Sequence, residues 1–330
     1  MQRLRVKKES IVLENNKARN ILEPENKLIS LAIPTYRRNE ILVATITQLL
    51  SLPHKPNEIL ILDQTEKHTE PVLRTLNNFH DNGDIVWVQL STPSITYAMN
   101  AALRRAKGEI ILFLDDDIEI TSDIVREHVI GHQTSKATVV VGKVVQPWHT
   151  PQYPDNKKSC ECVTVNSEEF LWDEPRYVDS AMAGNMSVVK KQAIQYGGFD
   201  ENFVRVAYRF EDEFVQRVKY LGGSVYYHSA ASIRHLKVPE GGTRAFGNHL
   251  TTIKPHHSVG AYYYYFSAPL VRHRFLSIFK RLTKSIATRF HLKNPWWIPV
   301  TIISEISGMI FAILLYLRGP HRIDKHEYKS

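Results

Sequence analysis

The chain has 330 residues, of which 43% are hydrophobic, and a formal net charge of +8. This length exceeds that of one average domain and falls short of two, and the hydrophobic content excludes a chain that is disordered throughout. The two cysteines, Cys160 and Cys162, are one residue apart and have no partner pair at zinc-finger spacing. We therefore expect free thiols in a reducing compartment.

The positive charge is concentrated in one part of the chain. Residues 241–304 contain no Asp or Glu but nine Lys and Arg, so the rest of the chain is close to neutral. Such a local excess predicts an anionic partner, either lipid or nucleic acid. Residues 1–26 are polar and mixed in charge, and their only apolar run, Ile11-Val12-Leu13, is too short for a secretory signal. We expect the catalytic region to be cytoplasmic.

Five short apolar runs recur in the first half of the chain, at residues 28–33, 59–62, 85–90, 110–114 and 138–145. They are rich in Ile, Leu and Val, which is typical of strands buried on both faces of a sheet. Helix-length segments lie between them, and one has an apolar face formed by Leu42, Ile46, Leu49 and Leu50. This alternation predicts an α/β fold with a mostly parallel sheet flanked by helices.

Polar residues follow the predicted strands, and in a parallel sheet they meet at the edge where ligands bind. The first run is followed by Pro34-Thr35-Tyr36-Arg37, the second by Asp63 and the fourth by Asp115-Asp116-Asp117. No glycine-rich phosphate loop follows the first run, so a dinucleotide-binding or P-loop site is not expected.

The three adjacent aspartates repel one another, so at least one pKa should rise unless a cation lies among them. Carboxylate oxygens suit Mg²⁺ or Mn²⁺, which commonly bridge protein carboxylates and substrate phosphates. The alternative is a solvated turn in which Asp117 or Ser122 caps the following helix. The position of the triplet at the end of a buried strand favours the metal.

A second acidic cluster, at residues 211–213, follows a short predicted helix at residues 190–196. Apolar residues recur around it at helical spacing, at Phe210, Phe214, Val218 and Leu221. The cluster therefore opens a helix whose other face packs inward. Carboxylates are favoured in the first turn of any helix, which is the structural alternative to a catalytic role. Two short strands are predicted further on, and the second ends at His235.

Five segments, in this order and spacing, resemble glycosyltransferase family 2, the inverting enzymes with the GT-A fold. They are the opening strand and turn at residues 28–37, the second strand at 58–63, Tyr97-Ala98-Met99-Asn100, Lys107-Gly108-Glu109 and the D-x-D element at 115–117. The resemblance covers residues 28–235 and is to membrane-associated bacterial-type members. It implies metal-dependent transfer of a sugar from a nucleotide donor.

The resemblance implies roles for residues on the donor side. The nucleotide would be held by Thr35, Tyr36 and Asp63, with Pro34, Arg37, Asn100, Asp115 and Asp116 beside it. Mn²⁺ or Mg²⁺ would be ligated by Asp117, Asp115 and His235. Met99 stands where many relatives carry arginine, so the contact made by that arginine is not expected here.

On the acceptor side, the resemblance implies that Asp212 is the catalytic base, with Glu211 as the alternative and Glu213 pointing elsewhere. A carboxylate in this position would deprotonate the acceptor hydroxyl as the new bond forms. Gly184 and Asn185 would line the sugar pocket, and Arg244, in a glycine-rich turn, would reach the diphosphate.

The last part of the chain is aromatic, basic and apolar. A basic amphipathic helix is predicted at residues 271–290, which suits a surface of anionic lipid. Residues 296–317 are long and apolar enough to span a bilayer, but Glu305 near their middle would cost about 2.5–3.5 kcal/mol to insert. A spanning helix, an interfacial or re-entrant hairpin and a buried soluble helix all remain open.

We expect a polar segment at 1–26, a GT-A-like domain at 27–245 and a helical membrane-associating tail at 246–330. The domain divides into a nucleotide-binding half (27–146) and an acceptor half (147–245). The expected activity is transfer of a hexose from a UDP-linked donor to a glycan or lipid-linked acceptor in polysaccharide assembly, by a single displacement with inversion. The alternatives are a membrane scaffold whose site has decayed and a nucleotidyltransferase. Nucleic-acid binding is not expected, because it gives the long apolar segment no role.

Overall fold

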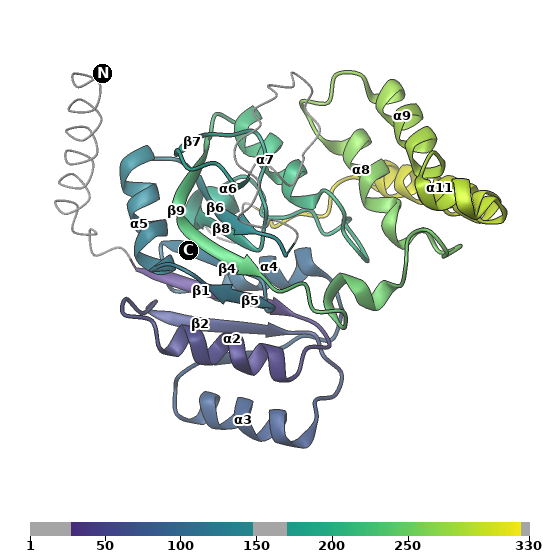
Figure 1. The fold of residues 1–330 in the computed structure, drawn as a ribbon. Helices are drawn as coiled ribbons and strands as arrows, with labels where there is room; N and C mark the ends of the chain where they lie inside the picture. Colours follow the sequence, from purple (N-terminus) through teal and green to yellow (C-terminus); the bar gives the residue numbers. More distant parts are fainter. Residues whose placement is uncertain (1–27, 148–169, 325–330) are drawn as a thin grey trace, which may run out of the picture.

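The structure, a computed structural model, describes residues 28–147 and 170–324 (Figure 1). Its first part alternates strands and helices: β1 (Ile29–Thr35), α2 (Glu40–Leu50), β2 (Glu58–Asp63), α3 (Glu70–Asp81), β3 (Val86–Gln89), α4 (Ile95–Arg105) and β4 (Ile110–Leu114). Next come β5 (Ile118–Ile120), α5 (Ile124–Ser135) and β6 (Val139–Val145). The five predicted strands are confirmed. Cys160, Cys162 and residues 1–26 lie outside the described residues.

The segment after the three aspartates differs from the alternative considered for it. Strand β5 follows Asp117 directly, and helix α5 begins only after Asp123. The Ser122 hydroxyl donates a hydrogen bond to the Ser232 carbonyl of a neighbouring strand and caps no helix. The aspartates therefore lie in a loop between two strands of the same sheet.

The central sheet has the order β3-β2-β1-β4-β8-β6-β9-β5, and β7 (Arg176–Tyr177) pairs with β9. Strands β3, β2, β1 and β4 are parallel to one another, as the sequence predicts. Beyond β4 the sheet is mixed, because β8 (Asn185–Val189) runs antiparallel to both β4 and β6. Strand β9 (Val225–His235) is one continuous strand where two were predicted, and its pairing with β6 shifts register between Gly142 and Lys143.

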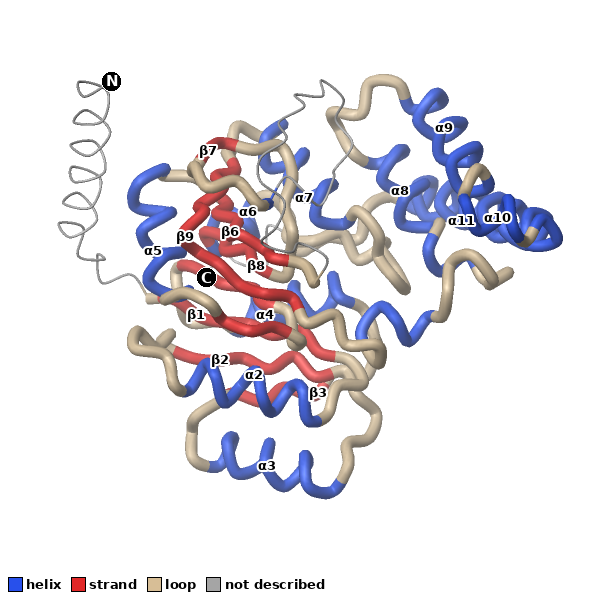
Figure 2. The backbone as a smooth tube through the Cα atoms, in the orientation of Figure 1, coloured by secondary structure: helices blue, strands red, loops and turns tan. Residues whose placement is uncertain are grey.

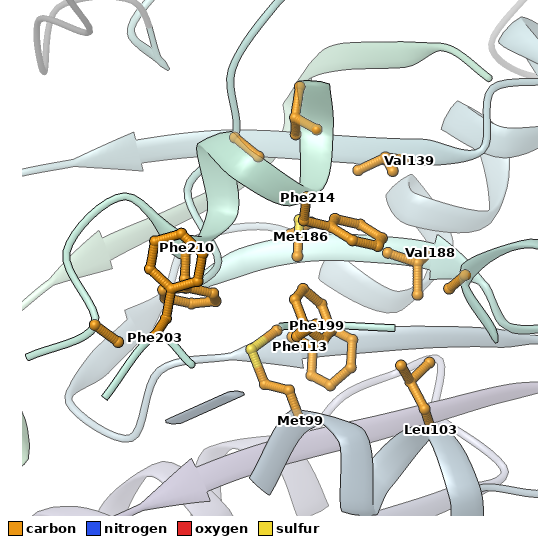
Figure 3. Close-up of a cluster of buried hydrophobic side chains, with 14 of the residues drawn as sticks. Met99, Leu103, Phe113, Val139, Met186, Val188, Phe199, Phe203, Phe210 and Phe214 are labelled. Carbon is orange, nitrogen blue, oxygen red and sulfur yellow. The ribbon is translucent and has the colours of Figure 1, made fainter. Parts of the chain in front are cut away.

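Two apolar cores cover the two faces of the sheet, because successive strand residues point to opposite sides. Leu31 and Leu112 face a core formed with α2, α3 and α5. Ala32 and Phe113 face the other core, formed with α4, α6 (Lys190–Gln195) and α7 (Phe210–Tyr220). Figure 3 shows the centre of this second core, where the ring of Phe199 lies between α4 and α7. Its ring centroid is 4.5 Å from that of Phe214, which fixes the start of α7 against the sheet.

The chain after β9 forms a helical extension on one side of the sheet domain (Figure 2). It contains η2 (Gly242–Phe246), η3 (Pro255–His257), α8 (Val259–Ser267), α9 (Arg274–Ile286), α10 (Arg289–Lys293), η4 (Pro295–Trp297) and α11 (Ile298–Arg318). Helix α8 packs against both α7 and α11. After α11 the chain returns to the sheet domain, where Ile323 is buried.

Candidate active site

One cavity of about 490 Å³ opens at the carboxyl ends of β1 and β4. The loop after β4 contributes Asp115, Asp116 and Asp117 to its wall, and the first turn of α7 contributes Glu211 and Asp212. The two acidic clusters are almost one hundred positions apart in the sequence. The fold therefore brings both to a single site at the sheet edge where ligands are expected.

Asp115, Asp117 and His235 form a group that could hold a metal ion, since their ligand atoms all lie within 4.8 Å of one another. The Nε2 atom of His235 is 3.0 Å from Oδ1 of Asp117 and 3.9 Å from Oδ2 of Asp115. Its other ring nitrogen, Nδ1, is 3.1 Å from Oε1 of Gln146. With Nδ1 donating to Gln146, Nε2 is left as the atom that faces the carboxylates, which is the arrangement of ligating histidines.

The electrostatics of this group fit a cation. Burial, together with the charge of Asp117, raises the pKa of Asp115. Burial would lower the pKa of His235, but its hydrogen bond to Asp117 and the charge of Asp115 outweigh it, and the pKa is raised. Two carboxylates and an imidazole around one point suit Mn²⁺ or Mg²⁺. The residues present therefore fit the metal that the sequence predicts.

Gly184 lies against Asp115, where a Cβ atom would be 2.1 Å from Oδ2 of that carboxylate. The same segment accepts a backbone hydrogen bond, from the Asp115 N–H to the Gly184 carbonyl. Gly184 lines the cavity, as expected for a pocket residue. Because Gly184 has no side chain, the carboxylate of Asp115 can occupy the space beside it.

Arg38 is a buried arginine that contacts two of the three aspartates. Its Nε is 3.2 Å from Oδ1 of Asp116, its Nη2 is 3.2 Å from Oδ2 of Asp117, and its side chain is only 6% exposed. It also donates to the carbonyls of Val238 and Glu240, which follow β9. Sequence reasoning missed Arg38, although the dipeptide Arg37-Arg38 directly after the first strand pointed to two candidates.

Arg37 lies outside the main cavity. It has a left-handed backbone (φ 54°), a side chain that is 53% exposed, and an ion pair with Glu66 at 3.0 Å. Its guanidinium lies 5.0 Å from the ring centroid of Tyr36. Arg37 therefore lies beside Tyr36 at the surface, and its predicted place near the nucleotide base stays a prediction.

Tyr36 and Thr35 do line the cavity. The Thr35 hydroxyl donates to Oδ2 of Asp116 at 2.7 Å, and burial raises the pKa of Asp116 to about 7. The ring of Tyr36 is nearly parallel to that of Phe246, with centroids 6.4 Å apart. The segment after β9, which carries Phe246, also brings Arg244 to the site, where its Nη1 lies 3.6 Å from Oδ2 of Asp117.

Asp63 is buried and does not line the cavity. Its carboxylate accepts hydrogen bonds from the Trp87 indole at 2.9 Å and from the Thr65 N–H, and His68 Nε2 lies 2.6 Å away. Burial would raise the pKa of Asp63, but these hydrogen bonds outweigh it and the pKa is lowered. The carboxylate of Asp63 is thus engaged with the protein in this structure, and its predicted contact with a nucleotide base stays a prediction.

Asn100 and Asn185 also hold the protein together instead of facing the cavity. Asn100 exchanges two hydrogen bonds of 2.8 Å with the backbone of Phe199. Asn185 donates to the carbonyl oxygens of Lys143 and Ala231, and its oxygen lies 2.8 Å from Nε2 of His128. Both side chains are fully buried. The predictions that Asn100 lies beside the nucleotide and that Asn185 lines the sugar pocket stay predictions, and in this structure both side chains bond to the protein.

The acidic first turn of α7 places its three carboxylates in different surroundings. Asp212 accepts a hydrogen bond of 3.0 Å from Nε of Arg209. Burial, together with the charge of Asp212, raises the pKa of Glu211 to about 8. Glu213 is fully buried away from the cavity, where it forms an ion pair with Arg217 at 2.8 Å. Glu211 and Asp212 are thus the two carboxylates of this turn that face the cavity.

A parallel sheet edge that carries a cation-binding group opposite a pair of acids defines the GT-A class of glycosyltransferases, which use nucleotide-sugar donors. The chain belongs to glycosyl transferase family 2, whose family model matches residues 30–197. It is also similar to an uncharacterized glycosyltransferase of Bacillus subtilis (strain 168), YfnE, with 24% identity over 198 residues. That alignment covers 58% of this chain and 48% of YfnE, so the chain spans about half the length of this relative.

Solved structures show the same fold at low sequence identity. S. aureus TarS 1-349 in complex with UDP-GlcNAc is 14% identical, with a TM-score of 0.55 and coverage of 88% of this chain and 92% of that one. A longer TarS chain has a TM-score of 0.52, and this chain covers 44% of it. The mannosyltransferase PcManGT from Pyrobaculum calidifontis, in complex with GDP-Man and Mn²⁺, is 12% identical, with a TM-score of 0.50 and coverage of 91% and 82%.

Proposed function

We propose that this chain transfers a hexose from a UDP-linked donor to a hydroxyl of a glycan or lipid-linked acceptor, in one displacement with inversion. The observation that carries the proposal is that one cavity is lined by both the metal-binding group and the acid pair of α7. One base and one cation suffice for such a step, without a covalent intermediate.

Asp115, Asp117 and His235 would hold Mn²⁺ or Mg²⁺. When bound, the cation supplies positive charge to the departing nucleotide diphosphate. Arg244 lies against Asp117 and would contact the same phosphates from the loop after β9. Arg38 forms ion pairs with Asp116 and Asp117, and these would keep Asp117 in position to bind the cation.

Asp212 takes the role of catalytic base in this proposal. An ion pair such as the one with Arg209 requires the ionised form of Asp212, and only an ionised carboxylate can accept the acceptor's proton. Glu211, whose pKa is raised to about 8, keeps its proton at neutral pH and cannot accept another. The difference in surroundings between two adjacent carboxyl groups supports a difference in role.

The nucleotide base is proposed to stack on Tyr36, whose ring lines the cavity opposite Phe246. A uracil base is supported by the fold similarity to TarS, whose structure contains UDP-GlcNAc. The acceptor would approach from the side of α7. We also propose that the transfer serves polysaccharide assembly. The helical extension next to α7 is proposed to contact membrane lipid, while the cytoplasmic location of the catalytic domain stays a prediction from the sequence.

The proposal is tested by nucleotide release from a panel of UDP- and GDP-sugars, using full-length protein purified in detergent. We expect release with Mn²⁺ or Mg²⁺ and its loss with a chelator. Asp212→Asn should lower transfer to acceptor by roughly 10²–10⁴-fold while leaving donor binding measured by calorimetry intact. Asp81→Asn, a change at an exposed carboxylate on α3, is the matched control and should have no effect.

Each other result rejects part of the proposal. Wild-type transfer by Asp212→Asn would remove the base assignment. Formation of pyrophosphate from a nucleoside triphosphate and a sugar 1-phosphate, without release of nucleoside diphosphate from the sugar-nucleotide panel, would indicate the nucleotidyltransferase alternative. Absence of donor binding with and without cation would leave the decayed scaffold.

A further inference from the structure

In helix α11 the distribution of polar and apolar residues is the reverse of that in a water-soluble helix. Its buried face consists mainly of small and polar residues, namely Thr301, Ser304, Glu305, Gly308 and Ala312, together with the larger Leu315. Its exposed face is a stripe of large apolar residues, namely Ile303, Ile306, Ile310, Ile313, Leu314 and Leu317. A helix in water places its apolar residues inward. Small and polar residues at helix contacts, with apolar residues outside, are typical of helices in contact with lipid.

The buried face of α11 is fully engaged with the rest of the extension. Arg281 of α9 donates two hydrogen bonds of 3.0 Å to Glu305, and the Tyr262 hydroxyl of α8 donates a third at 2.7 Å. A Cβ atom at Gly308 would lie 2.0 Å from the Ser258 hydroxyl, so α11 approaches the start of α8 closely. The polar face is therefore satisfied by the protein, and the apolar stripe is left to solvent or to a partner.

The neighbouring helices extend this apolar surface. On α9, Phe275 is 86% exposed and Phe279 63%. Leu292 of α10 is 84% exposed, and Trp296 is 66% exposed just before α11 begins. Large apolar side chains with this exposure, gathered on three consecutive helices, mark a contact surface.

Basic residues accompany these apolar side chains. Lys280 and Lys284 are exposed on α9, Lys293 follows on α10, and Arg318 ends α11. Residues 241–304 carry no carboxylate that could neutralise them. This charge complements an anionic lipid surface.

The contacts of α11 do not suit a helix that crosses the bilayer, although Pro295–Arg318 is long and apolar enough by composition. Spanning would carry the Glu305–Arg281 pair to the centre of the bilayer, with exposed Lys280 and Lys284 beside it. The chain after α11 is also bound to the sheet domain. Asn202 donates to the Gly319 carbonyl, and Arg322 forms ion pairs with Asp200 and Glu213.

We infer that α9, α10 and α11 form a docking surface that lies flat on an anionic bilayer, without crossing it. The apolar stripe of α11 and the aromatic side chains of α9 enter the boundary between headgroups and acyl chains, and the lysines contact lipid phosphates. This inference specifies how the lipid partner of the proposed function is bound, and it does not depend on catalysis.

The test is flotation of the full-length protein with vesicles of phosphatidylcholine alone or mixed equally with phosphatidylglycerol. We expect binding that is stronger to the anionic vesicles. The double variant Ile306→Ser/Ile310→Ser should weaken it roughly tenfold, because partition of apolar surface into lipid is lost. Lys280→Gln/Lys284→Gln should remove most of the preference for anionic lipid. Leu221→Ser, at a leucine exposed to a similar degree outside the extension, and Lys191→Gln are the matched controls.

An alkaline carbonate wash distinguishes the two membrane arrangements: a protein bound at the surface is released, and a spanning helix is retained. Retention would overturn the inference, as would equal loss of binding in the control variants or no binding to either vesicle. A stable dimer in detergent-free buffer that dissociates in Ile306→Ser/Ile310→Ser would show that a second copy covers the surface instead. Donor release, measured on the same variants in detergent, should be unchanged, so a failed transferase assay and a failed flotation assay are separate outcomes.

Discussion

A methyl group added to Gly184 would lie 2.1 Å from Oδ2 of Asp115, too close for both to keep their positions. Gly184→Ala should therefore displace Asp115 and weaken binding of Mn²⁺ by about 10–100-fold, the range seen when the support of a metal ligand is lost. Calorimetric titration of Mn²⁺ in the presence of UDP measures this effect.

The control for that variant is Gly83→Ala. Gly83 has no atom within 4 Å of an added Cβ but has a positive φ of 77°. It should lose about 1 kcal/mol of stability through backbone strain and keep its affinity for Mn²⁺. Equal affinities in the two variants would show that the space beside Asp115 is not required.

Arg38→Ala should lower the free energy of unfolding by about 3–5 kcal/mol, because it removes a buried ion-pair partner of Asp116 and Asp117. Arg37→Ala should change it by less than about 0.5 kcal/mol, since that side chain is exposed. Urea unfolding measures both. Added Mn²⁺ should stabilise the Arg38 variant more than the wild type, and similar losses in the two alanine variants would contradict the assignment.

Gln146→Leu should weaken Mn²⁺ binding by about 10–100-fold, because Nδ1 of His235 would lose the oxygen that orients the ring. Gln133→Leu is a control of the same chemistry. Gln133 is also buried, and its side-chain amide has no hydrogen-bond partner within the described part of the chain. Its replacement should leave Mn²⁺ affinity unchanged. Unaltered affinity in Gln146→Leu would show that His235 is oriented in another way.

The contribution of Glu211 to the stability of the metal-free protein should fall as the pH rises from about 4.5 to about 8. Burial and the charge of Asp212 raise the pKa of Glu211 from 4.5 to about 8, so in this window the folded state holds a proton that the unfolded state has released. Glu211→Gln stays uncharged at every pH and should recover about 2 kcal/mol at the alkaline end, after allowance for partial solvent exposure. Urea unfolding across this range, with chelator present, should give diverging curves; parallel curves would exclude the proton on Glu211.

The parallel half of the sheet could be predicted because each of its strands is a continuous apolar run ended by polar residues. The three aspartates at the cavity followed from the same pattern, since they end such a run, whereas the ligand roles of Asp115, Asp117 and His235 were expected only from the family resemblance. The direction of β8 could not be predicted, because Asn185–Val189 has the same apolar character in either orientation. Periodicity also gives no information on hydrogen-bond partners, so the intramolecular contacts of Asn100 and Asn185 could not be predicted: an asparagine that bonds to backbone and one that binds a ligand look alike in sequence.

Arg38 shows a different limit. Two arginines follow β1, and the backbone turn at Arg37 (φ 54°) sends one outward and the other beneath the aspartates. The sequence contains no sign of that turn, because left-handed residues are only weakly marked outside glycine and asparagine. Which face of α11 is exposed could likewise be seen only once its contacts with α8 and α9 were known.

The segment that follows α11 links the helical extension to the sheet domain. Arg322 forms ion pairs with two buried acids, Asp200 and Glu213, and Glu213 belongs to α7, the helix that presents Asp212. A truncated chain that stops before Arg322 would leave the buried Asp200 without this arginine and Glu213 with Arg217 alone, so the glycosyltransferase region depends on the residues that follow α11. The sheet domain and the segment after α11 would therefore have to be kept together in any chimeric protein.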